Sequence, residues 1–246
     1  MKILGIIPVR YASSRFPGKP LALIHGKPMI RRVYEQVQQS ASISRLIVAT
    51  DDERIVSEVT AFKGEVILTS VHHQSGTERC AEVRKQLKET FDVVINIQGD
   101  EPFIQPQQIE LLCSLFQQDD TQISTLIKKI TEAGELTNPN VVKVVVAENN
   151  EALYFSRSPI PFFKGVSGNY WLSMGTYYKH VGIYGYKSEV LEQIVKLPVN
   201  QLEHAESLEQ LRWLANGYSI KTAITDLESF SIDTPTDLEH AIKFLA

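Results

Sequence analysis

The strongest constraint on the fold is an alternation, through the first half of the chain, of short apolar runs with amphipathic stretches of helix length. The apolar runs have the length of strands and lie at 3–9, 45–50, 65–70 and 92–98. Between them, apolar residues recur three and four positions apart, as in helices that cover a sheet. Because strands and helices that alternate in this way form parallel sheets through right-handed crossovers, we predict a Rossmann-like α/β fold. Its open, mostly parallel sheet is flanked by helices.

The second half of the chain changes character. Strands are predicted at 123–130, 140–146, 152–156 and 180–186, and they are separated by longer polar loops, above all 157–178. We expect a single domain over 1–246 in which approximately 122–186 form a smaller, β-rich subdomain that closes over a ligand. A helix near 203–216, a strand near 218–224 and a helix from Pro235 to Phe244 are expected to complete the chain.

Composition excludes several classes of protein. The net charge of −4 argues against a general nucleic-acid binder, and 43% hydrophobic with 22% charged residues is typical of a soluble globular protein. The opening apolar run is short, ends at Arg10 and lacks a cleavage site, and no run is long enough to span a membrane. We therefore expect a cytoplasmic protein with no membrane partner. Cys80 and Cys113 lie far apart without a paired motif, which suits reduced thiols.

The loop after the first strand is rich in cations. Arg10, Arg15 and Lys19 are interleaved with small residues, which let backbone N–H groups approach an anion, namely Ala12, Ser13, Ser14 and Gly18. Arginine supplies forked donors and lysine a mobile point charge, a combination that suits a triphosphate. The patterns GxxxxGK[ST] and GxGxxG do not occur, which argues against an ATPase or a nicotinamide dehydrogenase.

Carboxylates follow the fourth predicted strand in "NIQGDEP", 96–102. Asp100 lies where ligands bind in open parallel sheets, and Mg²⁺ is commonly held by one or two carboxylates together with substrate phosphates. We predict a metal-binding role for Asp100 and leave Glu101 undecided. Asp233, in "SIDTPTDL", has two equal interpretations from its spacing: it caps the final helix together with Thr234, or it points toward the same metal.

Other polar segments are weaker signals. "HHQSGTER", 72–79, has the pattern of a loop followed by a helix start, and its adjacent histidines lack the spacing of a zinc pair. Arg157 follows a strand, while His180 and Tyr184 share one strand face. Together these three side chains are suited to a carboxylate or several hydroxyls, although each taken singly is more often structural.

Ten segments in the same order closely resemble the 3-deoxy-manno-octulosonate cytidylyltransferase (CMP-Kdo synthetase) family, from the first strand to the last helix. They are "IIPVRYASSRFPGKPL", "GKPMI", "VATDDERI", "HHQSGTER", "NIQGDEP", "NPNVVKVV", "ALYFSRSPIP", "HVGIYGY", "LEQLRWLANG" and "SIDTPTDLE". The resemblance implies the nucleotide-diphospho-sugar transferase type of fold and a homodimeric, Mg²⁺-dependent enzyme. Such an enzyme joins CTP and the sugar acid Kdo into CMP-Kdo, with release of pyrophosphate, for lipopolysaccharide synthesis. One departure is Ser231, where the family usually has Gly.

The resemblance also implies roles for individual residues. Asp100 and Asp233 would hold Mg²⁺, and Lys19 would join them in catalysis. The implied nucleotide-binding residues are Pro8, Arg10, Ala12, Ser13, Arg15, Lys19, Ser75 and Arg79. The implied sugar-binding residues are Gln98, Arg157, His180, Tyr184 and Glu209. The subdomain near 122–186 would contribute to sugar binding and to dimerisation.

The residues leave three alternatives open. The substrate could be a related sugar acid, such as an amino-substituted Kdo or sialic acid. A metal-dependent glycosyltransferase is disfavoured because "QGDEP" lacks the D-x-D pattern. A nucleotide-binding regulator without catalysis is the third alternative.

Overall fold

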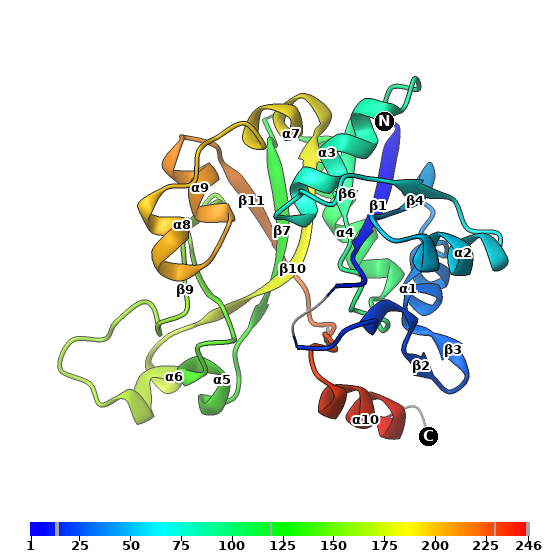
Figure 1. Cartoon of the computed structure of the whole chain (residues 1–246). Coiled ribbons are helices and arrows are strands. Elements are labelled where there is room, and N and C mark those ends of the chain that lie inside the picture. The colour runs from blue at the N-terminus through cyan, green and yellow to red at the C-terminus, as the bar shows by residue number, and fades with distance from the viewer. Residues whose placement is uncertain (13–14, 119, 229, 245–246) are drawn as a thin grey trace.

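A nine-stranded mixed sheet runs through the molecule (Figure 1). The computed structural model describes residues 1–12, 15–118, 120–228 and 230–244. The main path of the sheet has the order β11-β7-β10-β6-β1-β4-β5. In chain order its strands are β1 (Ile3–Val9), β4 (Arg45–Thr50), β5 (Val66–Leu68), β6 (Val93–Asn96), β7 (Ile123–Lys129), β8 (Lys143–Val146), β9 (Ala152–Ser156), β10 (Tyr178–Lys187) and β11 (Ile220–Ile224). A separate small ribbon joins β2 (Leu23–Ile24) to β3 (Lys27–Pro28).

The direction of the strands confirms the predicted, mostly parallel sheet. β6, β1, β4 and β5 run parallel, and β11 runs parallel to β7. The exception is β10, which is antiparallel to both of its main-path neighbours, β6 and β7. The carboxyl ends of β1 and β6 lie together, because Ile6 pairs with Asn96 in the register. Segments that follow these two strands are therefore neighbours at one edge of the sheet.

Helices cover both faces of the sheet, so the molecule has three layers. Side chains of β1 alternate between the layers: Ile3 and Ile7 pack in one core and Leu4 and Ile6 in the other. The first core is covered by α1 (Met29–Val37), α2 (Glu53–Ala61) and α4 (Pro106–Ser114). The second is covered by α3 (Gly76–Gln86), α7 (Ser188–Ile194) and α9 (Gln210–Ala215). Every helix in the described parts of the chain is too short or too polar to cross a bilayer.

Part of the second half lies off the main path of the sheet. The hairpin of β8 and β9 lies near α5 (Ala133–Thr137) and α6 (Trp171–Met174), which occupy the lower left of Figure 1. A small apolar cluster around Leu136 and Tyr177 packs with Trp171 from α6. Although β7 and β10 fall within the predicted range 122–186, both pair in the central sheet. The role of that range in sugar binding and dimerisation stays a prediction.

The predicted helix near 203–216 is in fact two helices. α8 (Gln201–Glu206) ends at Ser207, whose φ of 52° lies in the left-handed region, and α9 begins three residues later. The turn lets Leu208 and Leu211 reach the second core. Helical periodicity continues across such a break, which is why the pattern alone predicts one helix.

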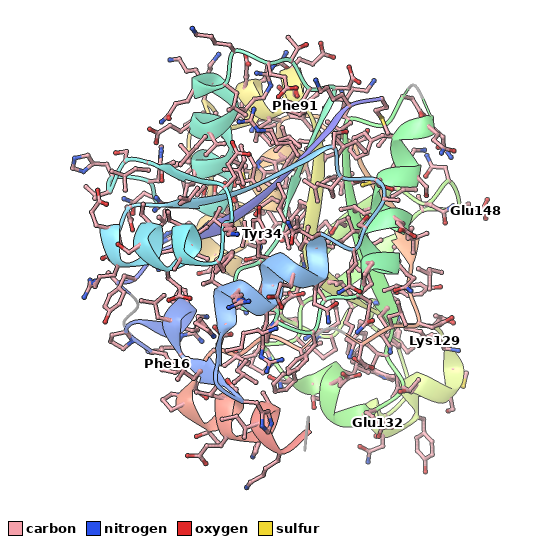
Figure 2. The ribbon with its side chains drawn as sticks, turned by 90° about the vertical axis from the view of Figure 1, so that its right-hand side faces the viewer. Phe16, Tyr34, Phe91, Lys129, Glu132 and Glu148 are labelled. Carbon is pink, nitrogen blue, oxygen red and sulfur yellow. The ribbon has the colours of Figure 1, made fainter. Side chains whose placement is uncertain are left out.

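The last helix, α10 (Pro235–Phe244), begins and ends as predicted and packs beneath the loop that follows β1 (Figure 1). A third apolar cluster, built around Ile232 and Ala241, joins α10 to the β2–β3 ribbon and to Phe16. Figure 2 shows Phe16 beside this helix. The cluster holds three distant segments together at the carboxyl edge of the sheet: the opening loop, the segment after β6 and the approach to α10.

Candidate active site

Two aspartates that are far apart in sequence lie together at this edge. Asp100 follows β6, and its backbone carbonyl accepts a hydrogen bond of 2.9 Å from the N–H of Ile232. Since Ile232 is fully buried, this bond fixes the residue that follows it, Asp233, close to Asp100. The structure therefore brings together the two carboxylates that the sequence predicts as metal ligands.

The ammonium of Lys19 contacts both carboxylates. Its Nζ lies 2.6 Å from Asp100 Oδ2 and 3.3 Å from Asp233 Oδ1. Lys19 belongs to a 3-10 helix, η1 (Lys19–Leu21), whose N-cap Gly18 has a φ of 73°, a conformation that favours glycine. Arg15 also contacts Asp233 Oδ1, at 3.2 Å, from a largely exposed guanidinium. Cations of the opening loop thus turn toward the carboxylates.

The helix start beyond Asp233 is capped by other side chains, and a metal-binding role for Asp233 stays a prediction. The carboxylate of Asp237 accepts hydrogen bonds from the N–H groups of Asp233 and Thr234 and from the Thr234 hydroxyl. Burial acts to raise the pKa of Asp237, but these hydrogen bonds outweigh it and lower the pKa. Thr234 and Asp237 therefore cap α10, and the side chain of Asp233 is left to Lys19 and Arg15. The T-x-x-D spacing in the sequence is the signal that identifies this capping pair.

Ser231 is compatible with this turn. It is not among the described non-glycine residues with a positive φ. The conformation of the turn therefore does not require the glycine that the family usually has at this position.

A small pocket of about 180 Å³ lies beside the end of β1. Its walls include four of the eight predicted nucleotide-binding residues, namely Pro8, Arg10, Ser75 and Arg79, together with Gln98. Gly76 lies against Pro8: a Cβ at Gly76 would be 3.0 Å from the proline ring. Ala12 and Arg15 are outside these walls, and Ser13 lies outside the described residues.

A hydrogen-bond network supports the floor of the small pocket. Ser75 caps α3 by accepting the N–H of Glu78, and its own hydroxyl donates to Glu209 Oε1 at 3.0 Å. Glu209 also accepts from the Thr77 hydroxyl at 2.7 Å and from Arg212 at 3.0 Å. Burial raises the pKa of Glu209 despite these donors. The structure thus places Glu209 against Ser75 and Thr77 at the start of α3, and the sugar-binding role that the resemblance implies for Glu209 stays a prediction.

Arg79 is also held by the protein itself. Its guanidinium is buried, lies 2.8 Å from Asp51 Oδ2 and contacts Thr69 and the carbonyl of Ser70. Asp51 follows β4, so this ion pair links the exits of β4 and β5 to α3. A role in cytosine recognition stays a prediction for Arg79.

A second and larger cleft has a volume of about 770 Å³. Arg15, Glu101 and Asp233 line its side toward the carboxylate pair, and Arg157 and His180 line its far side. Gln98 connects the two cavities: it lines the small pocket, and its amide donates at 2.9 Å to the carbonyl of Gly182, which lines the cleft. The segment from Gln98 to Glu101 therefore passes from one cavity to the other, with Asp100 between them.

His180 lines the larger cleft, and Tyr184 lies behind it in the core. Their rings are 5.1 Å apart, although a bulge in β10 intervenes between them. His180 Nε2 lies 3.0 Å from the Thr125 hydroxyl, and burial lowers the pKa of the imidazole to about 4. Tyr184 is buried against Trp213 and is absent from the cleft wall, and its hydroxyl has no hydrogen-bond partner among the described residues. His180 is thus a neutral side chain at the cleft, and contact of Tyr184 with a ligand stays a prediction.

The carboxylate pair suits Mg²⁺. Asp100 and Asp233 already share one cation, the Lys19 ammonium, and carboxylate oxygens are the ligands that Mg²⁺ prefers. Within the described ranges, no group of three or more His, Cys, Asp and Glu side chains could hold a metal ion. A pair of aspartates completed by oxygens of a bound substrate fits both observations.

Comparisons with known proteins agree with this geometry. The Cytidylyltransferase family model matches residues 4–224. A 3-deoxy-manno-octulosonate cytidylyltransferase of Parabacteroides distasonis is 54% identical over 250 residues, which cover 100% of this chain and 99% of that protein. The protein of the same name from Phocaeicola vulgatus is 56% identical over 248 residues, which cover 100% of this chain and 98% of that protein.

Solved structures lead to the same family. The structure of CMP:2-keto-3-deoxy-manno-octonic acid synthetase complexed with CTP has a TM-score of 0.92 and 43% identity, and covers 100% of this chain and 98% of its own. A 4-diphosphocytidyl-2C-methyl-D-erythritol synthase from Anaerococcus prevotii has a TM-score of 0.63 and 14% identity, and the match covers 99% of this chain and 98% of that protein. At this identity, the likeness shows the fold alone. Since its relatives are this similar over nearly their whole length, the chain belongs to the 3-deoxy-manno-octulosonate cytidylyltransferase family of nucleotidyltransferases.

Proposed function

We propose that this chain joins CTP and 3-deoxy-D-manno-octulosonate (Kdo) to give CMP-Kdo and pyrophosphate. The observation that carries the proposal is the convergence of Lys19, Asp100 and Asp233 next to two cavities that Gln98 connects. The relatives that match the whole chain are named for this cytidylyl transfer, and the structure with the high TM-score is described as a complex with CTP. The product implies a role in the supply of activated Kdo for lipopolysaccharide synthesis.

The two cavities suggest a division of the substrates. The cytidine part of CTP is assigned to the small pocket at the start of α3, and the sugar acid to the larger cleft, where Arg157 supplies a cation for its carboxylate. The triphosphate then passes the carboxylate pair and the cations of the opening loop. This arrangement leaves the α-phosphate and the sugar close to Asp100.

In the reaction, the anomeric hydroxyl oxygen of Kdo bonds to the α-phosphorus of CTP. The bond from that phosphorus to the oxygen shared with the β-phosphate breaks, pyrophosphate leaves with its electron pair, and the hydroxyl loses its proton to water. Mg²⁺ held by Asp100 and Asp233 would offset phosphate charge and assist loss of this proton. Lys19 and Arg15 are suited to neutralise the departing pyrophosphate, because positioning and charge neutralisation carry most of the catalysis in phosphoryl-group chemistry.

Three further properties belong to the proposal. We infer a Mg²⁺-dependent enzyme from the carboxylate pair, and a homodimer from the resemblance to the family. We also infer a cytoplasmic location, which suits the two free and buried cysteines, Cys80 and Cys113.

A matrix of substrates tests the proposed function. Purified protein with Mg²⁺ is incubated with each of CTP, UTP, GTP and ATP against Kdo, amino-substituted Kdo and sialic acid, and pyrophosphate release and the nucleotide-sugar are measured. We expect the fastest turnover for CTP with Kdo, and no product when Mg²⁺ is removed by chelation. Faster turnover with another sugar acid would contradict the assignment of Kdo. CTP binding by calorimetry without product from any sugar acid would contradict catalysis altogether.

A further inference from the structure

A buried lysine lies close behind the wall of the larger cleft. Lys143 lies in β8, between β9 and β10, and is fully buried, with 0% of its surface exposed. The ammonium donates to three backbone carbonyls: Asn138 at 2.9 Å, Val141 at 2.6 Å and Arg157 at 2.5 Å. A protonated lysine has three N–H donors, so each donor has one carbonyl partner. All three of these partners belong to residues that line the cleft.

Glu206, at the end of α8, also binds Arg157, whose carbonyl accepts from Lys143. One of its carboxylate oxygens accepts the backbone N–H of Arg157 at 2.9 Å, and the other accepts the Ser156 hydroxyl at 2.6 Å. Its backbone carbonyl accepts Nε of the Arg157 guanidinium at 2.7 Å. The backbone donor and the backbone acceptor of Arg157 are therefore both bonded to charged side chains, from two different elements.

The guanidinium itself has little freedom. Besides the bond to Glu206, Nη1 of Arg157 donates to the carbonyl of Pro139 at 2.9 Å, and Nη2 makes a longer contact of 3.4 Å with that of Ser207. Lys143 bonds Asn138, the residue before Pro139, so it also fixes the segment that receives Nη1. Since a guanidinium has five N–H donors, the remaining donors stay available to a ligand in the cleft.

We propose that Lys143 and Glu206 are positioning residues that hold Arg157 in the orientation needed to bind the carboxylate of the sugar acid. The inference rests on the proposed function, because it takes Arg157 as the carboxylate-binding residue. Loss of either residue then leaves Arg157 in the chain but lets its segment move, and small displacements of a binding group cost much affinity. The effect falls on the sugar acid and spares CTP, whose proposed pocket lies at the start of α3.

The test compares Michaelis constants for both substrates in Arg157→Met, Lys143→Met and Glu206→Gln. We expect Arg157→Met to raise KM for Kdo by about 30-fold or more. Lys143→Met and Glu206→Gln should raise it by roughly 5- to 20-fold, with KM for CTP changed by less than about 2-fold. In the Arg157→Met background, Lys143→Met should raise KM for Kdo by less than about 2-fold more. Both substitutions remove the same interaction, that of Arg157 with the carboxylate of Kdo.

Lys221→Met provides a matched control. Lys221 is also buried, at 8% exposure, but it is in β11 and its ammonium contacts Asn149, Asp120 and Glu151, away from the cleft wall. Its loss should lower the melting temperature without changing KM for Kdo. Thermal unfolding is measured for every variant to verify folding. If Lys143→Met does not fold, Glu206→Gln tests the inference instead, because Glu206 is only half-buried.

The outcomes separate the two proposals. An unchanged KM for Kdo in Arg157→Met overturns the role of Arg157, and the inference with it. A large effect in Arg157→Met, with none in Lys143→Met or Glu206→Gln, overturns the inference alone. Equal increases in KM for both substrates, or effects that multiply fully in the Arg157→Met background, would assign Lys143 a purely structural role.

Discussion

At the scale of single residues, the central feature is a lysine that neutralises two carboxylates. Lys19 has a side chain only 15% exposed, and it lies within hydrogen-bond distance of both Asp100 and Asp233. Without it, two negative charges would face each other at short range. The same ammonium is assigned to the triphosphate during the reaction. The proposed function therefore gives Lys19 a second role, as a ligand for the substrate, besides that of an internal counter-ion.

Lys19→Met separates these two roles. Removal of the ammonium should raise the affinity of the nucleotide-free protein for Mn²⁺ several-fold, because a competing cation is lost. Turnover should fall on the order of 10²-fold, since charge on the leaving pyrophosphate is no longer offset. Electron paramagnetic resonance of free Mn²⁺ and pyrophosphate release measure the two quantities. Arg15→Met is the control, with smaller changes expected because its side chain is 68% exposed. Weaker Mn²⁺ binding by Lys19→Met would show that the ammonium does not compete with the metal.

His180 should make stability depend on pH. Burial lowers its pKa from 6.5 to about 4, so between these values the unfolded chain binds more protons than the folded one. The free energy of unfolding therefore falls as pH drops from 6.5 toward 4. We expect His180 to account for a loss on the order of 1 to 2 kcal/mol between pH 7.5 and pH 5, given that the ring partly faces the cleft.

Urea unfolding of the wild type and of His180→Gln at pH 7.5 and pH 5 measures this contribution. His180→Gln should lose less stability than the wild type over this interval. An identical loss in both proteins would mean that the imidazole keeps an ordinary pKa in the folded state.

At the scale of elements, the close approach of β1 to the loop after β6 determines where Asp100 lies. A Cβ on Gly99 would lie 2.1 Å from Val9 Cγ1 in the buried end of β1. Gly99→Ala should therefore cost about 1–3 kcal/mol of unfolding free energy, which urea denaturation measures. Gly99→Ala should also reduce formation of CMP-Kdo, because it displaces Asp100, the next residue.

Gly134→Ala is the matched control for this prediction. Gly134 lies in α5, and beyond the backbone of this helix no described residue comes within 4 Å of an added Cβ, so the substitution should be neutral or slightly stabilising. Unchanged stability and turnover in Gly99→Ala would show that the loop can move away from β1 without cost.

Most elements follow from sequence patterns that the structure confirms. The apolar runs at 3–9 and 45–50 coincide with β1 and β4, and α10 has the predicted bounds. The reversed direction of β10 has no local signal, because pairing with β6 and β7 is decided by the path of the intervening chain. The break at Ser207 is likewise local backbone geometry that periodicity does not contain.

The candidate site was only partly predictable from the sequence. The position of Asp100 after an apolar strand suffices for its prediction, whereas pairing with Asp233 depends on tertiary packing of Ile232. Lys143 is a lone cation within an apolar strand, which marks it in the sequence as an unusual residue. Its role depends on the backbone carbonyls that surround it, and these are known only from the fold. The resemblance implies a sugar-binding role for Glu209, whereas its contacts with Ser75 and Thr77 arise from tertiary packing at the start of α3, which no local pattern encodes.

At the scale of the whole molecule, the expected dimer requires an apolar surface. Phe162 is 71% exposed, and Tyr170 and Met174 are 63% and 57% exposed, all within the predicted loop 157–178. If the subdomain mediates dimerisation, Phe162→Asp should shift the protein toward a monomer in sedimentation equilibrium. Val71→Asp, at a side chain with 67% exposure outside this loop, is the control and should leave the mass unchanged. A dimer that persists in Phe162→Asp at the same concentrations would place the interface elsewhere.

The central claim is that Asp100 and Asp233 act as one unit in cytidylyl transfer. The most direct measurement is the single-turnover rate of CMP-Kdo formation at saturating CTP, Kdo and Mg²⁺ for Asp100→Asn, Asp233→Asn and the double variant, with circular dichroism to verify folding. We predict a loss on the order of 10²-fold or more in each single variant, and a double variant little slower than the worse single one, because groups that act together are not additive. Normal turnover in Asp100→Asn, or losses that multiply fully in the double variant, would contradict the claim.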